Sequence, residues 1–307
     1  MNSFKKISLN KGEMSVYEIG KLKLHAYKTN DFIDDEVFII EKNSKAVIIE
    51  SPCFYDNNQE LEQYINEKGM DVAGVLLSYH MAGGTFLSKT KKYATKNAAE
   101  YGTNGGGADL IRNFANSFGD IFDSSIHTVT DYITEGTVNI GGIDFIIIPT
   151  NDAFDIEIPE INVVYTHMLG HDCHSIIAGA GHADAIIAQL KGFIDKGYNL
   201  ILTSHYTPEN LEDVRVKIAY IKEIKNIAEY CKDADDFKTK VKEKYPDYSG
   251  ENYLNMTAEF FFPAGWACQQ SVIKTFVKRT KSSEIMLCII LKQVKAEPAS
   301  NPWLKLL

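Results

Sequence analysis

Short apolar runs alternate with Gly- and Asn-rich turns in the first half of the chain, a pattern typical of β-strands. Residues 23–27 alternate apolar and polar side chains, and the β-branched runs 36–40 and 46–49, joined by a polar turn, predict a hairpin. Residues 57–68 carry apolar side chains at helical spacing before Gly69, and the apolar run 72–77 is typical of a buried strand. This order predicts a mixed sheet rather than an all-β sandwich.

The α/β pattern continues to about residue 203. We expect helices over residues 109–118 and 183–196, and strands over residues 129–133, 137–140, 144–148, 162–166, 175–178 and 199–203, with Gly141-Gly142 as a hairpin turn. The glycine-rich segment 102–107 lacks the Lys-Ser/Thr pair of a phosphate-binding loop. We interpret it as a surface loop.

From residue 208 the pattern becomes helical. Residues 209–232 and 234–244 show helical periodicity, and the second run stops at Tyr245-Pro246. We expect an α/β domain over residues 1–207 and, over residues 208–307, a helical appendage and basic C-terminal tail packed on it. The tail could add a strand at residues 285–291. The helical part could cover the mouth of a cleft or form the face of a homodimer, with Trp266 buried in such a junction.

Composition narrows the class of protein. The chain is 45% hydrophobic and 24% charged, which suits a packed core, and its net charge of −9 argues against non-specific nucleic-acid binding. No run reaches the ~20 apolar residues of a membrane helix, and the N-terminus lacks the apolar stretch of a secretory signal. The five cysteines are scattered without a C-x-x-C pair, so we expect neither disulfides nor a zinc finger, and a cytoplasmic location. We interpret the excess of Lys and Arg over residues 272–307 as a solvated edge.

Histidines gather at or next to predicted strand ends, where side chains of α/β proteins usually meet ligands. These are His80, His167, His171, His174, His182 and His205. The densest group, residues 166–174, combines three imidazoles with Asp172 and Cys173, all side chains that bind zinc. Alternatively, these histidines only hydrogen-bond to backbone, and in a strand His174 would point away from the other two. We interpret Cys173 as a small buried thiol rather than a nucleophile.

Several of these segments together resemble the metallo-β-lactamase-fold hydrolases. They are the hairpin 37–50 followed by Ser51-Pro52, the helix 57–68, the strand entering Ser78-Tyr79-His80-Met81-Ala82-Gly83-Gly84, and the run Leu200-Ile201-Leu202-Thr203-Ser204-His205. The resemblance extends to about residue 224. It implies an αββα sandwich of two mixed β-sheets with outer helices.

The resemblance also implies a metal site, although this sequence departs from the family's metal-binding motif. In the family the strand runs into T-H-x-H-x-D-H-x-G-G, which holds one or two zinc ions, whereas here the segment is shorter and only His80 remains of the ligand core. Asp152, in Pro149-Thr150-Asn151-Asp152, stands where the family has Gly-His-Thr and could replace that histidine as a ligand. His205 matches the last metal-binding histidine.

Two hypotheses follow. In the first, His80, His205 and part of the set His167, His171 and His174 hold one Zn²⁺, with Asp152 or Asp172 as the catalytic carboxylate. The metal would activate water against an ester, lactone or amide carbonyl of a small-molecule substrate, and a further histidine would protonate the leaving group. In the second, the metal chemistry is lost and the fold binds a small molecule or a protein partner. The dense histidines favour the first hypothesis, and the shortened segment favours the second. We adopt the first as the working hypothesis.

Overall fold

The computed structural model describes residues 4–167 and 170–263, and these form two compact units. Of the described residues, one unit contains 4–167, 170–171 and 193–214, and the other contains 172–192 and 215–263. The basic tail, the expected strand at 285–291 and Trp266 lie outside the described residues.

The first unit contains a sheet of eight strands in the order β1-β2-β3-β4-β5-β6-β7-β8. Neighbours are antiparallel from β1 to β5 and parallel from β5 to β8. The predicted hairpin is confirmed, with Ile39 opposite Ile48. The strands are β1 (Phe4–Ser8), β2 (Glu13–Ile19), β3 (Leu22–Lys28), β4 (Glu36–Lys42), β5 (Lys45–Ile49), β6 (Asp71–Leu76), β7 (Lys92–Ala94) and β8 (Asp131–Tyr132).

A second sheet of six strands, in the order β14-β13-β12-β11-β10-β9, belongs to the same unit. Within this sheet β12 and β13 are parallel to each other, and every other pair of adjacent strands is antiparallel. The predicted glycine hairpin turn is confirmed, because Gly141 and Gly142 join β9 to β10 with φ of 63° and 84°. The strands are β9 (Gly136–Ile140), β10 (Ile143–Pro149), β11 (Phe154–Ile158), β12 (Val163–Thr166), β13 (Leu200–Thr203) and β14 (Tyr206–Glu209).

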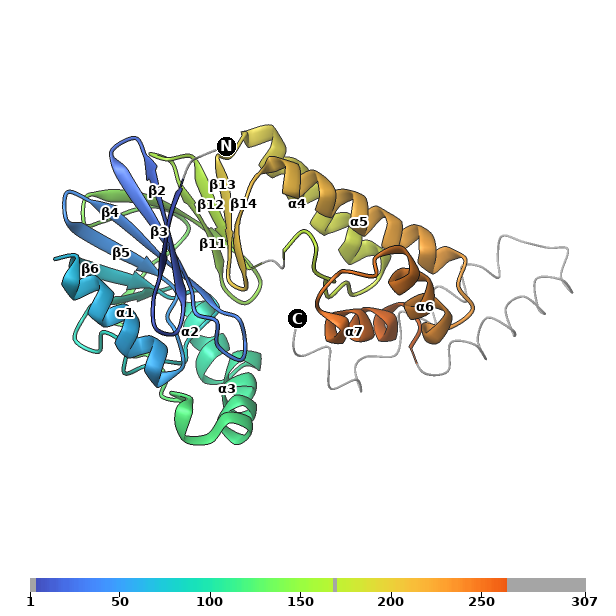
Figure 1. The fold of residues 1–307 in the computed structure, drawn as a ribbon, viewed down its shortest axis with the longest axis horizontal. Coiled ribbons are helices and arrows are strands. Elements are labelled where there is room, and N and C mark those ends of the chain that lie inside the picture. Colours follow the sequence, from blue (N-terminus) through green and yellow to red (C-terminus); the bar gives the residue numbers. More distant parts are fainter. Residues whose placement is uncertain (1–3, 168–169, 264–307) are drawn as a thin grey trace, which may run out of the picture. The chain divides into compact units, whose positions relative to one another are not determined.

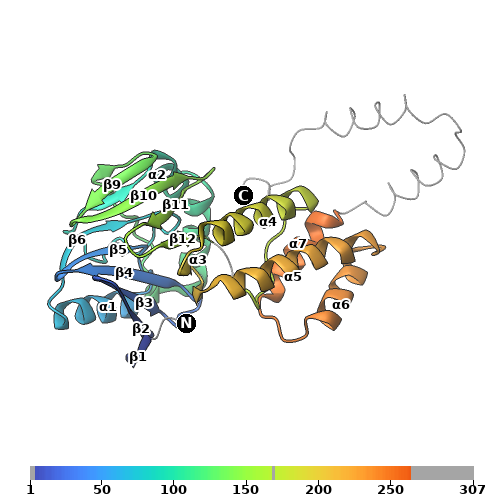
Figure 2. The same ribbon diagram turned by 90° about the horizontal axis from the view of Figure 1, so that it is seen from above.

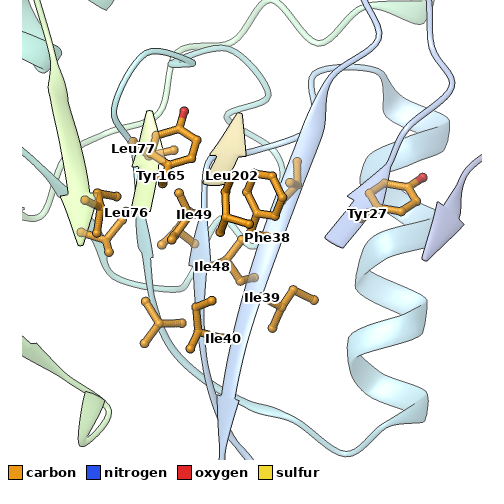
Figure 3. Close-up of a cluster of buried hydrophobic side chains, with 14 of the residues drawn as sticks. Tyr27, Phe38, Ile39, Ile40, Ile48, Ile49, Leu76, Leu77, Tyr165 and Leu202 are labelled. Atoms are coloured by element: carbon orange, nitrogen blue, oxygen red, sulfur yellow. The ribbon is translucent and has the colours of Figure 1, made fainter. Parts of the chain in front are cut away.

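The inner faces of the two sheets form the hydrophobic core. Phe38 of β4 meets Tyr165 of β12 with ring centroids 6.1 Å apart, and both side chains are fully buried together with Ile49 and Leu202 (Figure 3). Burying a side chain of this size stabilises the fold by about 1.5–3 kcal/mol. Figure 2 shows β9 to β12 of the second sheet, in green, layered on the blue strands of the first, with α1 on the outer side of the first sheet.

Among the described residues, the helices that lie wholly in the first unit are α1 (Tyr55–Glu67), α2 (Lys96–Thr103) and α3 (Gly106–Phe118) (Figure 1), and the 3-10 turn η1 (Gly119–Ile121) follows α3. Leu61 and Ile65 of α1 are part of the core, as their helical spacing predicts. Two mixed sheets with flanking helices therefore confirm the predicted sandwich.

The interpretation of residues 102–107 as a surface loop is wrong. Gly102 lies in α2, Gly106 and Gly107 begin α3, and all three are buried. A Cβ atom at Gly102 would meet the Met81 side chain at 2.2 Å, and one at Gly107 would meet Tyr101 at 2.8 Å. These glycines serve close packing rather than flexibility.

The second unit is helical where the structure describes it. Its helices are α4 (Ala180–Lys196) and α5 (Leu211–Glu229), each of which crosses the boundary between the units, α6 (Ala234–Lys244) and α7 (Glu251–Phe261). The predicted C-terminal helices are thus confirmed. None of the described helices is long and apolar enough to span a membrane.

The strand expected at residues 175–178 is wrong. This extended segment bonds to a helix instead of a neighbouring strand: the backbone N–H of Ile177 donates to Thr257 Oγ1 (2.8 Å), and that hydroxyl donates to the carbonyl of Ser175 (2.6 Å). An apolar run of this length does not by itself distinguish a strand from an extended segment packed on a helix.

Candidate metal centre

Three histidines from distant parts of the sequence lie together at one end of the sandwich. His80 follows β6, His167 follows β12, and His205 lies in the turn between β13 and β14. Each offers a ring nitrogen within 4.8 Å of the others, and their ring centroids are 5.0–5.6 Å apart. Because β12 and β13 are parallel, their carboxyl ends place His167 and His205 side by side.

A carboxylate that the sequence analysis missed lies against two of these rings. Asp35 immediately precedes β4 and its side chain is 1% exposed. Its Oδ1 atom lies 3.2 Å from Nδ1 of His205 and 3.8 Å from Nδ1 of His80. All three atoms are buried, and none makes a hydrogen bond.

These orphaned atoms fit a metal ion. A buried polar atom without a partner costs on the order of 1–3 kcal/mol, so such an arrangement requires an explanation. Zinc bonds to nitrogen and oxygen are about 2.0–2.2 Å long, which places neighbouring ligand atoms of a tetrahedral site roughly 3.3 Å apart. The two Asp35–histidine distances are close to that spacing.

The loop over residues 29–35 holds Asp35 in place through its own backbone. The backbone N–H and the hydroxyl of Thr29 both donate to the Asp35 carbonyl (3.0 and 2.9 Å), and Asn30 and Asp34 adopt positive φ values of 52° and 57°. The N–H of Glu36 donates to the carbonyl of Ser204 (2.7 Å), which ties the loop to the turn of His205. The three carboxylates at 31, 34 and 35, just before a buried strand, were the only sequence signal for this loop.

A second buried carboxylate, Glu50, positions the segment of His80. Glu50 follows β5 with a φ of 64°, is fully buried, and accepts the backbone N–H groups of Tyr79 (2.9 Å) and His80 (3.1 Å). The ring of Tyr79 then stacks on His167 at 4.4 Å. The shortened segment after β6 is therefore organised by Glu50 together with the stacked rings.

The electrostatics of the group favour a negative charge on Asp35. Burial alone would raise the pKa of Asp35, but the charge of His80, the contact with His205 and the thiol of Cys53 hold that pKa below its usual value. Burial lowers the pKa of His205, yet Asp35 outweighs this effect and the net pKa is raised. His167 keeps solvent-accessible surface, although the protein atoms around it and the two other imidazoles lower its pKa well below normal. Asp35 and the His205 imidazole therefore each favour the charged form of the other.

The other two predicted histidines lie apart from this group. Nδ1 of His171 is 2.9 Å from Oε1 of Glu209 and 3.7 Å from Oδ1 of Asp213. His174 belongs to the second unit, where its Nδ1 is 2.9 Å from the hydroxyl of Tyr220 and burial lowers its pKa to about 4. Neither belongs to a group of side chains with metal-binding spacing among the described residues.

The two predicted carboxylates are also placed elsewhere. Asp152 is half-buried in the turn after β10. Burial is the main cause of the raised pKa of Tyr79, and the negative charge of Asp152 raises it a little further. Asp172 is exposed and belongs to the second unit. Neither is part of a metal-binding group in the described chain, and Asp35 is the carboxylate beside the imidazoles.

Comparison with known proteins finds likeness in structure only. No protein-family model matches the chain, and no curated protein matches its sequence. The stereoselective inverting sec-alkylsulfatase Pisa1 from Pseudomonas sp. matches 80% of this chain with a TM-score of 0.55 at 14% identity. A metallo-β-lactamase from Erythrobacter litoralis matches 71% of this chain and 100% of its own, with a TM-score of 0.48 at 12% identity. The chain spans about half the length of the alkylsulfatase, 49% of it, and at this identity the likeness shows the fold alone.

Proposed function

We propose that this chain, which has the metallo-β-lactamase fold, is a metal-dependent hydrolase with a rebuilt mononuclear site at His80, His167 and His205. One observation carries the proposal: the buried Oδ1 of Asp35 faces the Nδ1 atoms of His80 and His205 without a hydrogen bond. A zinc ion at these ligands would supply a Lewis acid and lower the pKa of a water molecule.

The candidate site has a buried side, where Asp35 lies, and a solvent-exposed side, where His167 lies. Asp35 is the buried inner ligand, and its negative charge compensates part of the charge of a divalent cation. His167 retains exposed surface, so we place the approach of the substrate on its side. Tyr79 packs on His167, and because burial raises the pKa of its hydroxyl, that group keeps its proton and its bond to Thr150 Oγ1 (2.9 Å). We propose a small ester, lactone or amide as the substrate.

The setting of this activity is part of the proposal. The described cysteines Cys53, Cys173 and Cys231 are free thiols, which suits a reducing compartment such as the cytoplasm. We also propose that two copies of the chain form a homodimer through the helical part.

Metal content tests the proposal directly. Protein purified without added metal should contain at least about one equivalent of a transition metal, and less than roughly a tenth of an equivalent would overturn the proposal. His205→Ala should lose the metal. His182→Ala is the matched control, because His182 lies in α4 outside the group and should leave the metal content unchanged. Unchanged content in His205→Ala would mean that the metal is bound elsewhere.

A binding module without metal is the second candidate, favoured by the short segment that lacks the H-x-D-H ligands after His80. A ligand stabilises only the state that binds it, so under this alternative a chelator would leave the melting temperature of the protein unchanged. Under the proposal the chelator lowers it. A panel of chromogenic esters, lactones and amides, hydrolysed by the wild type but not by His205→Ala, would then assign the substrate class.

A further inference from the structure

We propose that a second cation site, formed by Asp31, Asp35 and Cys53, adjoins the first. Each of these side chains offers a ligand atom, and the three atoms lie within 4.8 Å of one another. None of the three lies in the segments 78–84, 149–152 or 200–205, from which the family resemblance draws metal ligands. The inference rests on the proposed function, because Asp35 would serve both sites.

The two oxygens of Asp35 face two different groups of side chains. Oδ1 faces Nδ1 of His205 and of His80, whereas Oδ2 accepts a hydrogen bond from Sγ of Cys53 at 3.3 Å. A carboxylate with its oxygens turned in this way can bridge two ions, and metal pairs in hydrolytic sites are about 3.5–4 Å apart. Asp35 is thus placed to join the imidazole site to a sulfur- and oxygen-lined site.

Asp31 brings a second carboxylate with an unsatisfied oxygen. Its Oδ1 accepts the backbone N–H of Ile33 (2.9 Å), whereas its Oδ2 is buried and makes no hydrogen bond. Among the described residues no Lys or Arg forms an ion pair with Asp31 or Asp35. Asp35 has the imidazoles of His80 and His205 beside Oδ1, whereas Asp31 has no ion-pair partner in the described chain, and a bound cation would stabilise its charge next to that of Asp35.

Cys53 determines which kind of cation fits. The residue is buried, with 4% of its surface exposed, and its carbonyl accepts the N–H of Asp123 (2.8 Å), which fixes the backbone after β5. A thiolate beside two carboxylates suits Zn²⁺ or Co²⁺, whereas Mg²⁺ and Ca²⁺ prefer oxygen alone. When the sulfur binds the ion, the thiol releases its proton to solvent. The other explanation, that the thiol only donates a hydrogen bond to Asp35, predicts no sulfur–metal bond.

Cobalt substitution distinguishes these explanations. Chelator-stripped wild-type protein should take up about two equivalents of Co²⁺, and near-ultraviolet absorption from thiolate-to-cobalt charge transfer should appear with one of them. Cys53→Ala should bind about one equivalent and lack the absorption, and Asp31→Asn should lose the same equivalent with Cys53 intact. Cys231→Ala is the matched control, because this buried thiol belongs to no metal-binding group in the described chain. It should behave as the wild type.

The outcomes separate this inference from the proposed function. A wild-type protein that binds about one equivalent without the charge-transfer absorption overturns the second site and leaves the imidazole site standing. A protein that binds no metal overturns both. Should Cys53→Ala fail to fold by circular dichroism, Cys53→Ser keeps a donor to Asp35 and should still lose the absorption. The wild-type spectrum decides the matter without any variant.

Discussion

Nδ1 of His205 lies 3.2 Å from Oδ1 of Asp35, and this contact joins the two sheets at the candidate metal centre. Asp35 enters β4 of the first sheet, and His205 lies in a turn of the second. The backbone bond from Glu36 to Ser204 runs beside it. Because the ligands come from both layers, the site forms only when the sheets pack, and a bound metal should stabilise that packing.

Asp35→Asn should weaken metal binding by at least about 100-fold, because the amide has nearly the same shape but no negative charge. Competition with a chromophoric chelator measures this affinity. Asp34→Asn is the control: Asp34 is exposed in the same loop, and asparagine tolerates its φ of 57°. Wild-type affinity in Asp35→Asn would show that the carboxylate is not a ligand.

Glu50→Gln should lower both metal affinity and stability. The buried carboxylate accepts two backbone N–H groups, from Tyr79 and His80, and an amide offers only one accepting oxygen. We expect the free energy of unfolding to fall by about 1.5–3 kcal/mol and metal affinity to fall by about 10–100-fold. Urea unfolding and chelator competition measure the two effects.

The control for Glu50 is Glu18→Gln, at an exposed position of β2, which should change neither quantity. A Glu50→Gln protein with lower stability but unchanged metal affinity would mean that Glu50 supports the fold without positioning His80.

The sequence predicted the local features of the fold more accurately than it predicted which residues form the candidate metal centre. The β4–β5 hairpin and the apolar face of α1 follow from periodicity, which depends on near neighbours only. His80 and His205 stand at strand ends, where the motif indicates them. Asp35 lies far from them in sequence, and only the packing of the two sheets brings it beside His205.

The dense segment 166–174 is divided between the two compact units, so closeness in sequence does not by itself bring its side chains together. The boundary between the two compact units falls between His171 and Asp172, so His167 lies in one unit and His174 in the other. His174 instead pairs with Tyr220 of the second unit. Counting potential ligands in the sequence cannot reveal the boundary between the two units, because that boundary depends on contacts with residues much later in the chain.

Acid should destabilise the metal-free protein partly through His127. Burial, reinforced by the positive charge of Lys92, lowers the pKa of this histidine to about 3, and its Nε2 lies 2.9 Å from Ser51 Oγ. The unfolded chain, with a pKa of about 6.5, takes up the proton first, so the free energy of unfolding falls as pH drops from 6.5 toward 3. Between pH 7 and pH 5 this contribution is about 2 kcal/mol.

His127→Gln should remove that part of the pH dependence. Urea unfolding of the chelator-stripped wild type and of the variant, each at pH 5 and pH 7, measures this pH dependence. The pH 7 values serve as the internal control, because at that pH the two proteins differ mainly by the packing lost with the imidazole ring. An equal decrease in stability for both proteins between the two pH values would contradict the assignment.

Two helical glycines should respond to alanine with opposite signs. A Cβ atom at Gly102 in α2 would lie 2.2 Å from Cγ and 2.5 Å from Cβ of Met81, whereas one at Gly192 in α4 would meet nothing within 4 Å. Met81 is buried, and its carbonyl accepts the N–H of His127 (2.9 Å), so it cannot easily move away.

Alanine gains about 0.5–1 kcal/mol over glycine inside a helix, and overpacking costs about 1–3 kcal/mol. Gly192→Ala should therefore raise the free energy of unfolding in urea, and Gly102→Ala should lower it. Because Met81 directly follows His80, Gly102→Ala should also weaken metal binding, whereas Gly192→Ala should not. A stabilised Gly102→Ala protein would show that α2 can shift away from the segment of His80, and that the close packing at Gly102 does not hold this ligand in place.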